Sequence, residues 1–588
     1  MPAHYVSMPL SRRPVNELAR NPPPPQPAAP VAGKQSWPAL PPLVPVLLPL
    51  VVAAVVLSAA FAYFFPAAQT RPAPVPRFTD VTAASGLRLP YAADDAAGPT
   101  SLAGAVAVLD YDGDGRPDLF FVSGAAWPWQ EQLGKRPGRT SCTLFHNEGG
   151  NHFTDVTERA GLAVELQGMG AAAGDFDNDG RVDLFVTCVG ANHLFRNLGH
   201  GHFEDVTEAA GVAGDEHTWS TGAAWIDVDG DGKLDLVVAH YARWAPEVSL
   251  ELAFTVARVG RSYGAPVGFV SAFPTVYRNL GDGHFAPLPG SAGLRDIDRQ
   301  TGLAVAEPLA VVPVDANGDG KIDLLFSYQQ SDNALFLNRG NGTFRRWSAG
   351  REDRHEGAGA GIASAGALPP GFIVKDERLA VFDAAATLPF LENYVGTAQK
   401  LGVAPIDYAL DGRLEFVSPD AALEPAPGRL ENAPPARRPR MFWREGSAWT
   451  DITPSQAAWD RPMLARGIAI ADFDGDGDLD VVVAQHGGEP VLWRNDQHLG
   501  FPWLRVRLVA RRTQHEAFGA QVEVHTPRRV LVQTAMPAMS FMAQSESTLT
   551  FGLGEDARVR KIVVRWPSGI RQEIQPDGVN RTLVIREP

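Results

Sequence analysis

Short apolar runs recur along most of this chain, and acidic or glycine-rich turns separate them. Apolar runs such as 104–109 lead into acidic loops, and runs such as 184–187 lead out of them. Runs of this length, bounded by Asp, Asn and Gly, are typical of buried strands joined by tight turns. Each acidic loop is therefore predicted to be the turn of a β-hairpin.

A second repeated phrase follows each acidic loop. It occurs as 144–157 and 194–207, with weaker versions that begin at Val276, Leu335 and Met441. The phrase predicts a strand, an Asn/Gly turn and another strand, so one repeat unit holds four strands. Four strands per repeat are typical of one blade of a β-propeller. The pattern predicts an all-β fold.

The ends of the repeat region predict how the ring closes. Residues 78–82 form a lone outermost strand, and the last repeat ends at Val491–Asn495 without one. The first strand is expected to complete the last blade, which removes exposed sheet edges. Six blades are detected, and residues 345–400 have room for another. We predict six or seven blades and favour seven.

The acidic loops carry the metal chemistry. Five of them place oxygen side chains at positions 1, 3, 5 and 9 and Gly at position 6, and such hard ligands in a flexible loop suit Ca²⁺. The candidate ligands are Asp110, Asp112, Asp114 and Asp118 (loop 1), Asp175, Asp177, Asp179 and Asp183 (loop 2), Asp227, Asp229, Asp231 and Asp235 (loop 3), Asp315, Asn317, Asp319 and Asp323 (loop 4), and Asp472, Asp474, Asp476 and Asp480 (loop 6). The backbone carbonyl of position 7 is expected to complete each shell. We predict about five calcium sites.

Loop 5, residues 407–415, is a worn copy. Ala409 replaces one ligand and Glu415 replaces an Asp, so this loop is predicted to bind weakly or not at all. An EF-hand is the alternative for the five complete loops, but it needs a Glu at position 12, where these loops carry Phe or Val, and flanking helices. Five bound Ca²⁺ ions (+10) would bring the formal net charge of −15 to −5.

The repeats resemble FG-GAP (VCBS-type) repeats, which build the propeller of integrin α chains. The tail resembles an ASPIC/UnbV domain in its motifs 503–507, 518–524, 551–554 and 563–569. The combination is similar to the cartilage acidic protein family. This resemblance implies a calcium-binding propeller at 77–500 and a small β-rich domain at 501–588.

A different chain precedes the repeats. Residues 1–42 are Pro-rich and predicted to be disordered. Residues 43–65 carry no charge and are long enough for a transmembrane signal-anchor helix, followed by a linker at 66–76. Arg and Lys residues before this segment favour a cytoplasmic N-terminus and a periplasmic or extracellular propeller. A cleaved signal peptide is the alternative.

The sequence carries none of the catalytic motifs sought: His-Glu-x-x-His, a P-loop, Gly-x-Ser-x-Gly or a haem-attachment Cys pair. Cys142 and Cys188 are expected to be buried thiols, with a disulfide as the alternative. An acidic chain without a basic face argues against nucleic acid. We therefore expect a non-enzymatic module that binds a protein or glycan, with an enzyme built from the variable loops as the alternative. Variable loops such as 123–143 and 239–275 are the candidate binding elements.

Overall fold

The computed structural model describes residues 74–89, 104–123, 141–244, 255–256, 260–261, 270–295, 297, 304, 307–328, 334–347, 404–418, 438–445, 448–454, 459–486, 488–538 and 542–588. The chain divides into Met1–Arg71 and Pro72–Pro588, and the described residues all belong to the second unit. None of their helices is long and apolar enough to span a membrane. The predicted disordered segment 1–42 and membrane helix 43–65 lie outside the described residues.

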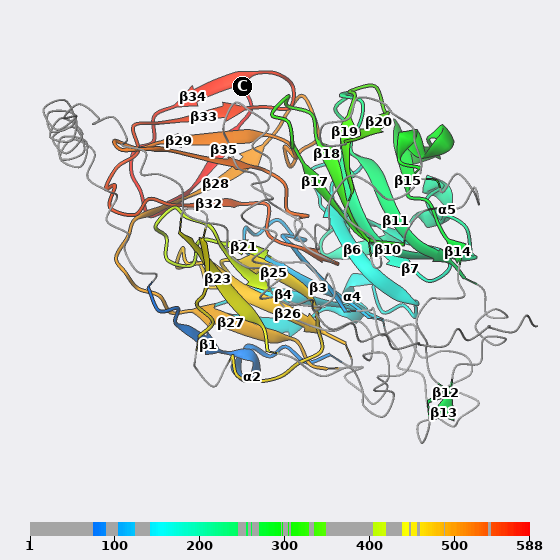
Figure 1. Ribbon diagram of the computed structural model, residues 1–588, viewed down its shortest axis with the longest axis horizontal. Helices are drawn as coiled ribbons and strands as arrows, with labels where there is room; N and C mark the ends of the chain where they lie inside the picture. Colours follow the sequence, from blue (N-terminus) through cyan, green and yellow to red (C-terminus); the bar gives the residue numbers. More distant parts are fainter. Residues whose placement is uncertain are drawn as a thin grey trace, which may run out of the picture. The chain divides into compact units, whose positions relative to one another are not determined.

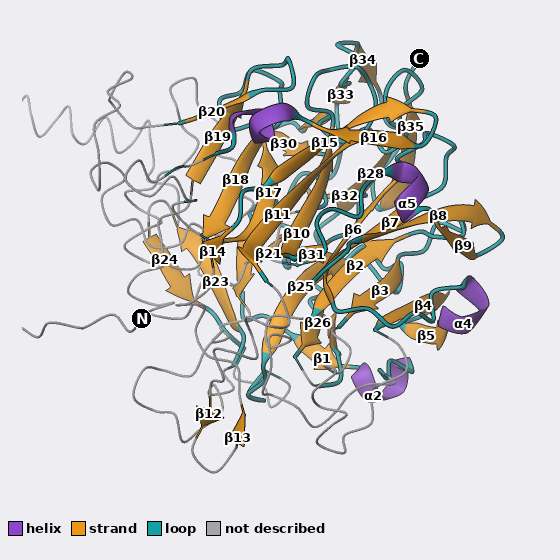
Figure 2. Cartoon of the chain, turned by 90° about the vertical axis from the view of Figure 1, so that its right-hand side faces the viewer, coloured by secondary structure: helices purple, strands orange, loops and turns teal. Residues whose placement is uncertain are grey.

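Six four-stranded antiparallel sheets follow one another along the chain (Figures 1 and 2), and we number them blades 1 to 6. Blade 1 consists of β2 (Ala105–Leu109), β3 (Asp118–Val122), β4 (Cys142–Gly149) and β5 (His152–Asp155). Blade 2 consists of β6 (Gly168–Gly174), β7 (Asp183–Cys188), β8 (His193–Gly199) and β9 (His202–Asp205). Blade 3 consists of β10 (Thr218–Ile226), β11 (Asp235–Arg243), β15 (Thr275–Gly281) and β16 (His284–Pro287), with β14 (Val270–Ser271) added beside β11.

Blades 4 to 6 repeat the arrangement. Blade 4 consists of β17 (Pro308–Val314), β18 (Asp323–Tyr328), β19 (Ala334–Asn338) and β20 (Phe344–Arg346). Blade 5 consists of β21 (Ala404–Ile406), β22 (Glu415–Ser418), β23 (Arg440–Glu445) and β24 (Ala448–Asp451). Blade 6 consists of β25 (Ala465–Ala471), β26 (Asp480–Gln485), β27 (Val491–Asn495) and β1 (Phe78–Asp80). Outside the blades lie the hairpin of β12 (Thr255–Val256) and β13 (Gly260–Arg261) and the short helices α2 (Thr82–Ser85), α4 (Thr157–Ala160), α5 (Thr207–Ala210) and η2 (Pro289–Gly293).

Each acidic loop joins the first two strands of a blade, so the hairpin prediction is confirmed and no EF-hand helices flank the loops. The first strands of neighbouring blades contact one another in the order β17, β10, β6, β2, β25, β21. This arrangement is propeller-like. Residues 348–403, which lie between blades 4 and 5 in the sequence, are outside the described residues, so a seventh blade there stays a prediction.

The first strand completes the last blade, as the sequence predicts. Phe78 pairs with Asn495 and Asp80 with Trp493 in an antiparallel register. A repeated Asp-Val-Thr motif fixes the outer strand: Asp80 Oδ1 accepts the Thr82 N–H at 3.0 Å, and Thr82 Oγ1 accepts the Leu492 N–H at 2.9 Å. In blade 2, Thr207 Oγ1 accepts an N–H at 2.8 Å in the same way. Where the outer strand ends, a threonine hydroxyl thus accepts the backbone N–H of the neighbouring strand in place of a backbone carbonyl.

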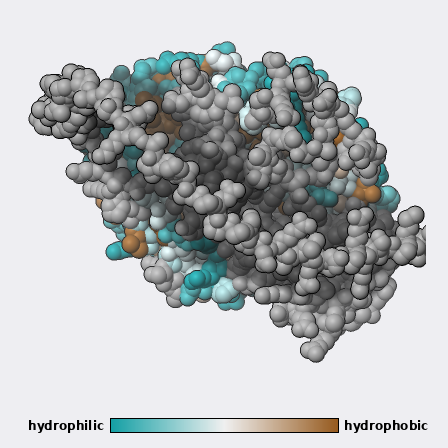
Figure 3. Space-filling model, viewed as in Figure 1, coloured by the Kyte–Doolittle hydropathy of each residue, from teal (hydrophilic) through white to brown (hydrophobic). Residues whose placement is uncertain are grey.

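Aromatic side chains fill the space between blades. Phe176 of loop 2 stacks on Trp225 of blade 3 with ring centroids 6.3 Å apart, and Phe473 of loop 6 packs edge-on against Phe153 of blade 1 at 5.7 Å. All four side chains belong to the core, since Phe176, Trp225 and Phe473 are almost fully buried and Phe153 is only 6% exposed. On the face shown in Figure 3, the described surface is mostly hydrophilic with scattered hydrophobic residues.

The tail forms two further sheets around its own core. One contains β32 (Leu549–Gly552), β28 (Trp503–Val509) and β35 (Arg581–Arg586), and the other contains β30 (Val530–Thr534), β29 (Gln521–His525), β33 (Lys561–Arg565) and β34 (Arg571–Ile574). A short strand, β31 (Ala543–Gln544), leaves this domain and pairs in parallel with β2 of blade 1. The tail therefore adds a fifth strand to a blade, which the sequence did not predict.

Candidate metal centres

The carboxylates at positions 1 and 9 hold the backbone of each acidic loop in place. The position 1 carboxylate accepts the backbone N–H of the position 6 glycine, for example Gly115 to Asp110 at 3.1 Å and Gly180 to Asp175 at 2.7 Å. The loop can turn there because Gly115 adopts a φ of +89°, which side chains disfavour. The position 9 aspartates are fully buried at the start of the second strand; they are Asp118, Asp183, Asp235, Asp323 and Asp480.

Positions 1, 3 and 9 converge in four loops. One carboxylate oxygen from each residue lies within 4.8 Å of the others in the groups Asp110, Asp112 and Asp118; Asp175, Asp177 and Asp183; Asp227, Asp229 and Asp235; and Asp472, Asp474 and Asp480. Loop 4 has Asn317 at position 3 and keeps the same turn, with the Gly320 N–H donating to Asp315 at 3.0 Å. Three or more oxygens directed at one point are the donor set that Ca²⁺ prefers.

Position 5 is arranged differently from the prediction of a simple ligand. Asp231 and Asp319 pair with the lysine at position 7 of their own loops, at 2.6 and 2.8 Å, and Asp114 and Asp179 pair with the arginine there. In loop 6, position 7 is Asp478, and this loop holds an additional carboxylate instead of a basic partner. The position 5 carboxylates of loops 1 to 4 therefore have a basic partner, and their role as ligands stays a prediction.

Burial makes the charged state of these clusters costly. Desolvation, opposed by hydrogen bonds from the backbone, raises the pKa of Asp118 to about 8 and that of Asp183 to about 9. Desolvation likewise raises the pKa of Asp235 and Asp323 to about 7. A divalent cation would add the positive charge that stabilises these buried carboxylates in their ionised form.

Two buried ligand atoms have no hydrogen-bond partner: Asp110 Oδ1 and Asp474 Oδ1. Both belong to the predicted ligand set, at position 1 of loop 1 and position 3 of loop 6. Buried oxygens without a partner are rare because they are costly, and a bound cation would satisfy them. The residues therefore fit a metal ion.

An asparagine in four of the repeated phrases connects neighbouring loops, a role that the sequence did not predict. The Asn197 N–H donates to Asp183 Oδ1 at 2.7 Å, and its Nδ2 donates to the Tyr111 carbonyl of loop 1 at 2.8 Å. Asn279 and Asn147 make the equivalent bonds to Phe176 and Phe473 of the preceding loops. The repeated Asn was the available signal, but a turn preference explains an Asn equally well.

Loop 5 lacks the position 3 carboxylate but keeps the ion pair between positions 5 and 7 that loops 1 to 4 also have. The Arg413 Nε donates to both carboxylate oxygens of Asp411, at 3.1 and 3.0 Å, and Ala409 is buried at position 3. Burial, followed by repulsion from Asp407, raises the pKa of Glu415 well above its ordinary value. Weak or absent metal binding at loop 5 stays a prediction that rests on Ala409 and Glu415.

The tail contacts the metal loops directly. Arg505 of β28 donates to Asp472 Oδ2 of loop 6 at 2.6 Å, and Arg507 of the same strand lies 3.2 Å from Asp110 Oδ2 of loop 1. Glu516 accepts the Asp175 N–H of loop 2 at 2.7 Å, and Arg529 donates to the Asp411 carbonyl of loop 5 at 2.6 Å.

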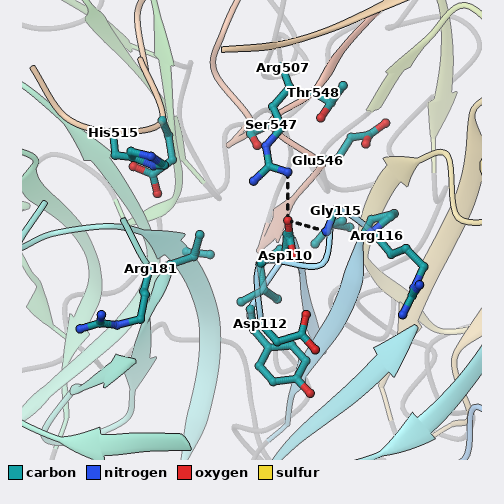
Figure 4. Close-up of a pocket in the computed structure, with 18 of the residues that line it drawn as sticks. Asp110, Asp112, Gly115, Arg116, Arg181, Arg507, His515, Glu546, Ser547 and Thr548 are labelled. Carbon is teal, nitrogen blue, oxygen red and sulfur yellow. Dashed lines mark hydrogen bonds and ion pairs between the residues drawn. The ribbon is translucent and has the colours of Figure 1, made fainter. Parts of the chain in front are cut away.

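A cavity of about 440 Å³ separates the tail from loops 1 and 2, and Figure 4 shows Arg507 reaching across it to Asp110.

Other residues singled out in the sequence have structural roles in the described part of the chain. His152, His202 and His284 each begin an outer strand and lie exposed on separate blades, as predicted. Cys142 and Cys188 are buried free thiols, which confirms the expectation of two unpaired cysteines. Burial raises the pKa of both thiols above the ordinary range, so neither favours a reactive thiolate.

Comparisons with known proteins agree with the repeated loops and the second domain. An FG-GAP-like repeat model matches residues 110–186, 176–238 and 315–366, and an ASPIC and UnbV model matches residues 510–588. The chain contains FG-GAP-like repeats and an ASPIC and UnbV domain.

Individual relatives extend the similarity over most of the FG-GAP-like and ASPIC and UnbV regions. The chain is 24% identical to cartilage acidic protein 1 of Xenopus tropicalis over 554 residues, covering 83% of this chain and 74% of that protein. It is 23% identical to the Homo sapiens protein of the same name over 562 residues, covering 90% and 78%. A solved Agrocybe aegerita lectin structure covers 77% of this chain and 86% of its own at 14% identity, with a TM-score of 0.31, which does not establish a shared fold.

Proposed function

We propose that this chain is an extracytoplasmic calcium-binding β-propeller that acts as a non-enzymatic module for binding a protein or a glycan. The observation that carries the calcium assignment is the convergence of position 1, 3 and 9 carboxylates in four loops within 4.8 Å. When bound, Ca²⁺ would neutralise these carboxylates and hold each hairpin loop in one conformation.

The compartment follows from the ion. Open oxygen-ligand loops in extracellular modules bind calcium at roughly 10⁻⁴–10⁻³ M, a concentration found outside the cytoplasm. The similarity to cartilage acidic protein 1 supports this placement. An uncleaved anchor at 43–65 would tether the propeller there. Full-length mass in the membrane fraction is expected; a mature protein that starts near Ala67 would instead identify a cleaved signal peptide.

The tail also bears on where a partner binds. It contacts loops 1, 2, 5 and 6, so it covers much of the rim that carries the metal loops. The connections between second and third strands leave the opposite ends of the strands, and two of them, 123–143 and 239–275, are long. Variable loops on a rigid scaffold commonly carry binding function. The opposite rim is therefore the proposed recognition surface.

Calorimetric titration of the metal-free full chain with CaCl₂ tests the metal assignment, and no heat of binding would refute it. A glycan array probed with and without calcium tests recognition. Shortening the connection between β11 and β15 to the length of the β7–β8 connection, with the strands left intact, should abolish captured glycan signals while calcium binding persists. If capture survives that change and is lost on Trp566→Ala in the tail, recognition belongs to the ASPIC and UnbV domain.

A further inference from the structure

Loop 1 has a histidine beside its position 3 and position 9 carboxylates, whereas His498 beside loop 6 is 74% exposed and lies 3.5 Å from the position 7 carboxylate of Asp478. His146 of β4 directs its Nδ1 at the cluster, 3.4 Å from Asp112 Oδ2 and 3.4 Å from Asp118 Oδ1. Asp112, Asp114 and His146 also offer ligand atoms within 4.8 Å of one another. The His146 side chain is only 14% exposed, and its Nδ1 is buried without a hydrogen-bond partner.

The equivalent position in other blades holds no metal-ligating nitrogen. It is the residue before the bridging asparagine, and blades 2, 3, 4 and 6 carry Arg196, Arg278, Leu337 and Arg494 there. Arg196 and Arg278 each pair with the position 3 carboxylate of their loop, at 2.6 and 2.7 Å. An arginine neutralises a carboxylate but cannot ligate a metal, whereas an imidazole nitrogen can. At 3.4 Å, His146 is also too far from either carboxylate for a hydrogen bond of ordinary length.

Asp110 differs from the position 1 residues of the other loops. Its Oδ1 is buried without a partner, while in loops 2 to 6 the corresponding Oδ1 accepts a backbone N–H three or four residues further along. Loop 1 thus contains two buried ligand atoms without hydrogen bonds, one oxygen and one nitrogen. Each lies beside the shared carboxylates Asp112 and Asp118.

We propose that loop 1 binds a first-row transition-metal cation of the Zn²⁺ class through Asp110, Asp112, Asp118 and His146, while the all-oxygen loops take calcium. This assignment rests on the proposed function for the other loops. Calcium favours oxygen ligands, whereas an imidazole favours Zn²⁺ and its neighbours. The 3.4 Å ligand separations match the edge of a tetrahedron whose metal–ligand bonds are about 2.1 Å long.

The surroundings of the ring support one orientation. Tyr111 packs edge-on against the His146 ring with centroids 5.9 Å apart. The opposite nitrogen, Nε2, lies 4.0 Å from the Glu148 carboxylate. That distance is too long for a hydrogen bond, and Nδ1 is the nitrogen that faces the carboxylates and could ligate.

The test uses the metal-free full chain with calcium in excess, so that the oxygen loops are filled. Titration with Co²⁺ should give one site with the visible absorption of a four-coordinate ion, and Zn²⁺ should displace it. His146→Leu, which copies Leu337, and His146→Arg, which copies Arg196, should each weaken this site by more than about 100-fold, since even loss of a supporting residue costs roughly 10–100-fold. His284→Leu is the control, because His284 lies exposed in a turn of another blade, and it should leave Co²⁺ binding unchanged.

The outcomes separate this inference from the proposed function. Calcium binding with no Co²⁺ site, or a Co²⁺ site that survives His146→Leu, overturns the loop 1 assignment alone. Absence of calcium binding in the same preparation overturns the proposed function. Unchanged calcium stoichiometry in His146→Leu shows that the variant is folded and that its lost site was not a calcium site.

Discussion

Replacing Arg505 by alanine should be strongly destabilising, because this residue joins the tail to loop 6 inside the protein. Its guanidinium donates to Asp472 at 2.6 Å and also pairs with Glu546. The three side chains are 9, 1 and 9% exposed. Burial raises the pKa of Glu546 to about 7 even though Arg505 opposes that shift. Truncation therefore leaves two buried carboxylates without their counter-charge.

Breaking a buried pair by removing one partner typically costs about 3–5 kcal/mol of unfolding free energy. With calcium removed by a chelator, we expect Arg505→Ala to lower the free energy of unfolding by an amount in this range. The loss should be smaller with calcium, since the ion would neutralise Asp472. Urea unfolding of the full chain, monitored by tryptophan fluorescence, measures the loss of unfolding free energy with calcium and without it.

Arg507 supplies the matched control. It lies two residues along β28, is 38% exposed, and faces Asp110 at 3.2 Å. Exposed ion pairs contribute about 0–1 kcal/mol, so Arg507→Ala should have little effect. Glu546→Gln in the Arg505→Ala background should restore part of the lost stability, because it removes one uncompensated charge. Equal costs for the two arginine variants would refute the reasoning.

Three other measurements follow from the same structure. Calcium at 100 times Kd should add about 2.7 kcal/mol per independent site, so the melting temperature of the full chain should rise with calcium; an identical curve in chelator contradicts a structural role for the ion. Asp177→Ala should lower calcium stoichiometry by one, whereas Asp411→Ala should change it little, and equal losses would mean that loop 5 is a working site. Burial lowers the pKa of His240 from 6.5 to about 4, so the unfolded chain binds the extra proton and stability falls as pH drops from 6.5 toward 4. His240→Gln should remove about 3 kcal/mol of that pH-dependent loss. The free energy of unfolding of the variant should therefore fall less steeply than that of wild type between pH 6.5 and 4. Parallel curves of unfolding free energy against pH would show that His240 does not titrate in this range.

The blades were predictable because their signals are local. Loop 1 and the apolar runs around it occupy fewer than twenty consecutive residues, and the hairpin between β2 and β3 forms from those residues alone. Ring closure was also predictable, since 78–82 repeats a phrase that ends other blades. Five copies of one pattern indicate a repeat fold far more strongly than any single copy would.

The tail contacts were not predictable, because they join residues far apart in the chain. Arg507 and Asp110 are separated by most of the described sequence, and nothing in the pattern around either residue specifies the other. The same limit applies to β31, whose two residues carry no strand signal of their own. His146 occupies a strand position where other blades carry Arg or Leu, so only the structure distinguishes a ligand from a surface residue.

The hydrogen bonds between loops bear on what a cation does for the whole molecule. Asn197 connects position 9 of loop 2 to the backbone of loop 1, and Asn147 connects loop 1 to loop 6 in the same way. A cation that fixes Asp183 also fixes the strand that holds Asn197, and through Asn197 it restrains loop 1. The tail contacts several of these loops at once and adds a second path between them. Metal removal from one loop should therefore weaken its neighbours, and metal affinity at loop 1 should fall when loop 2 loses Asp177.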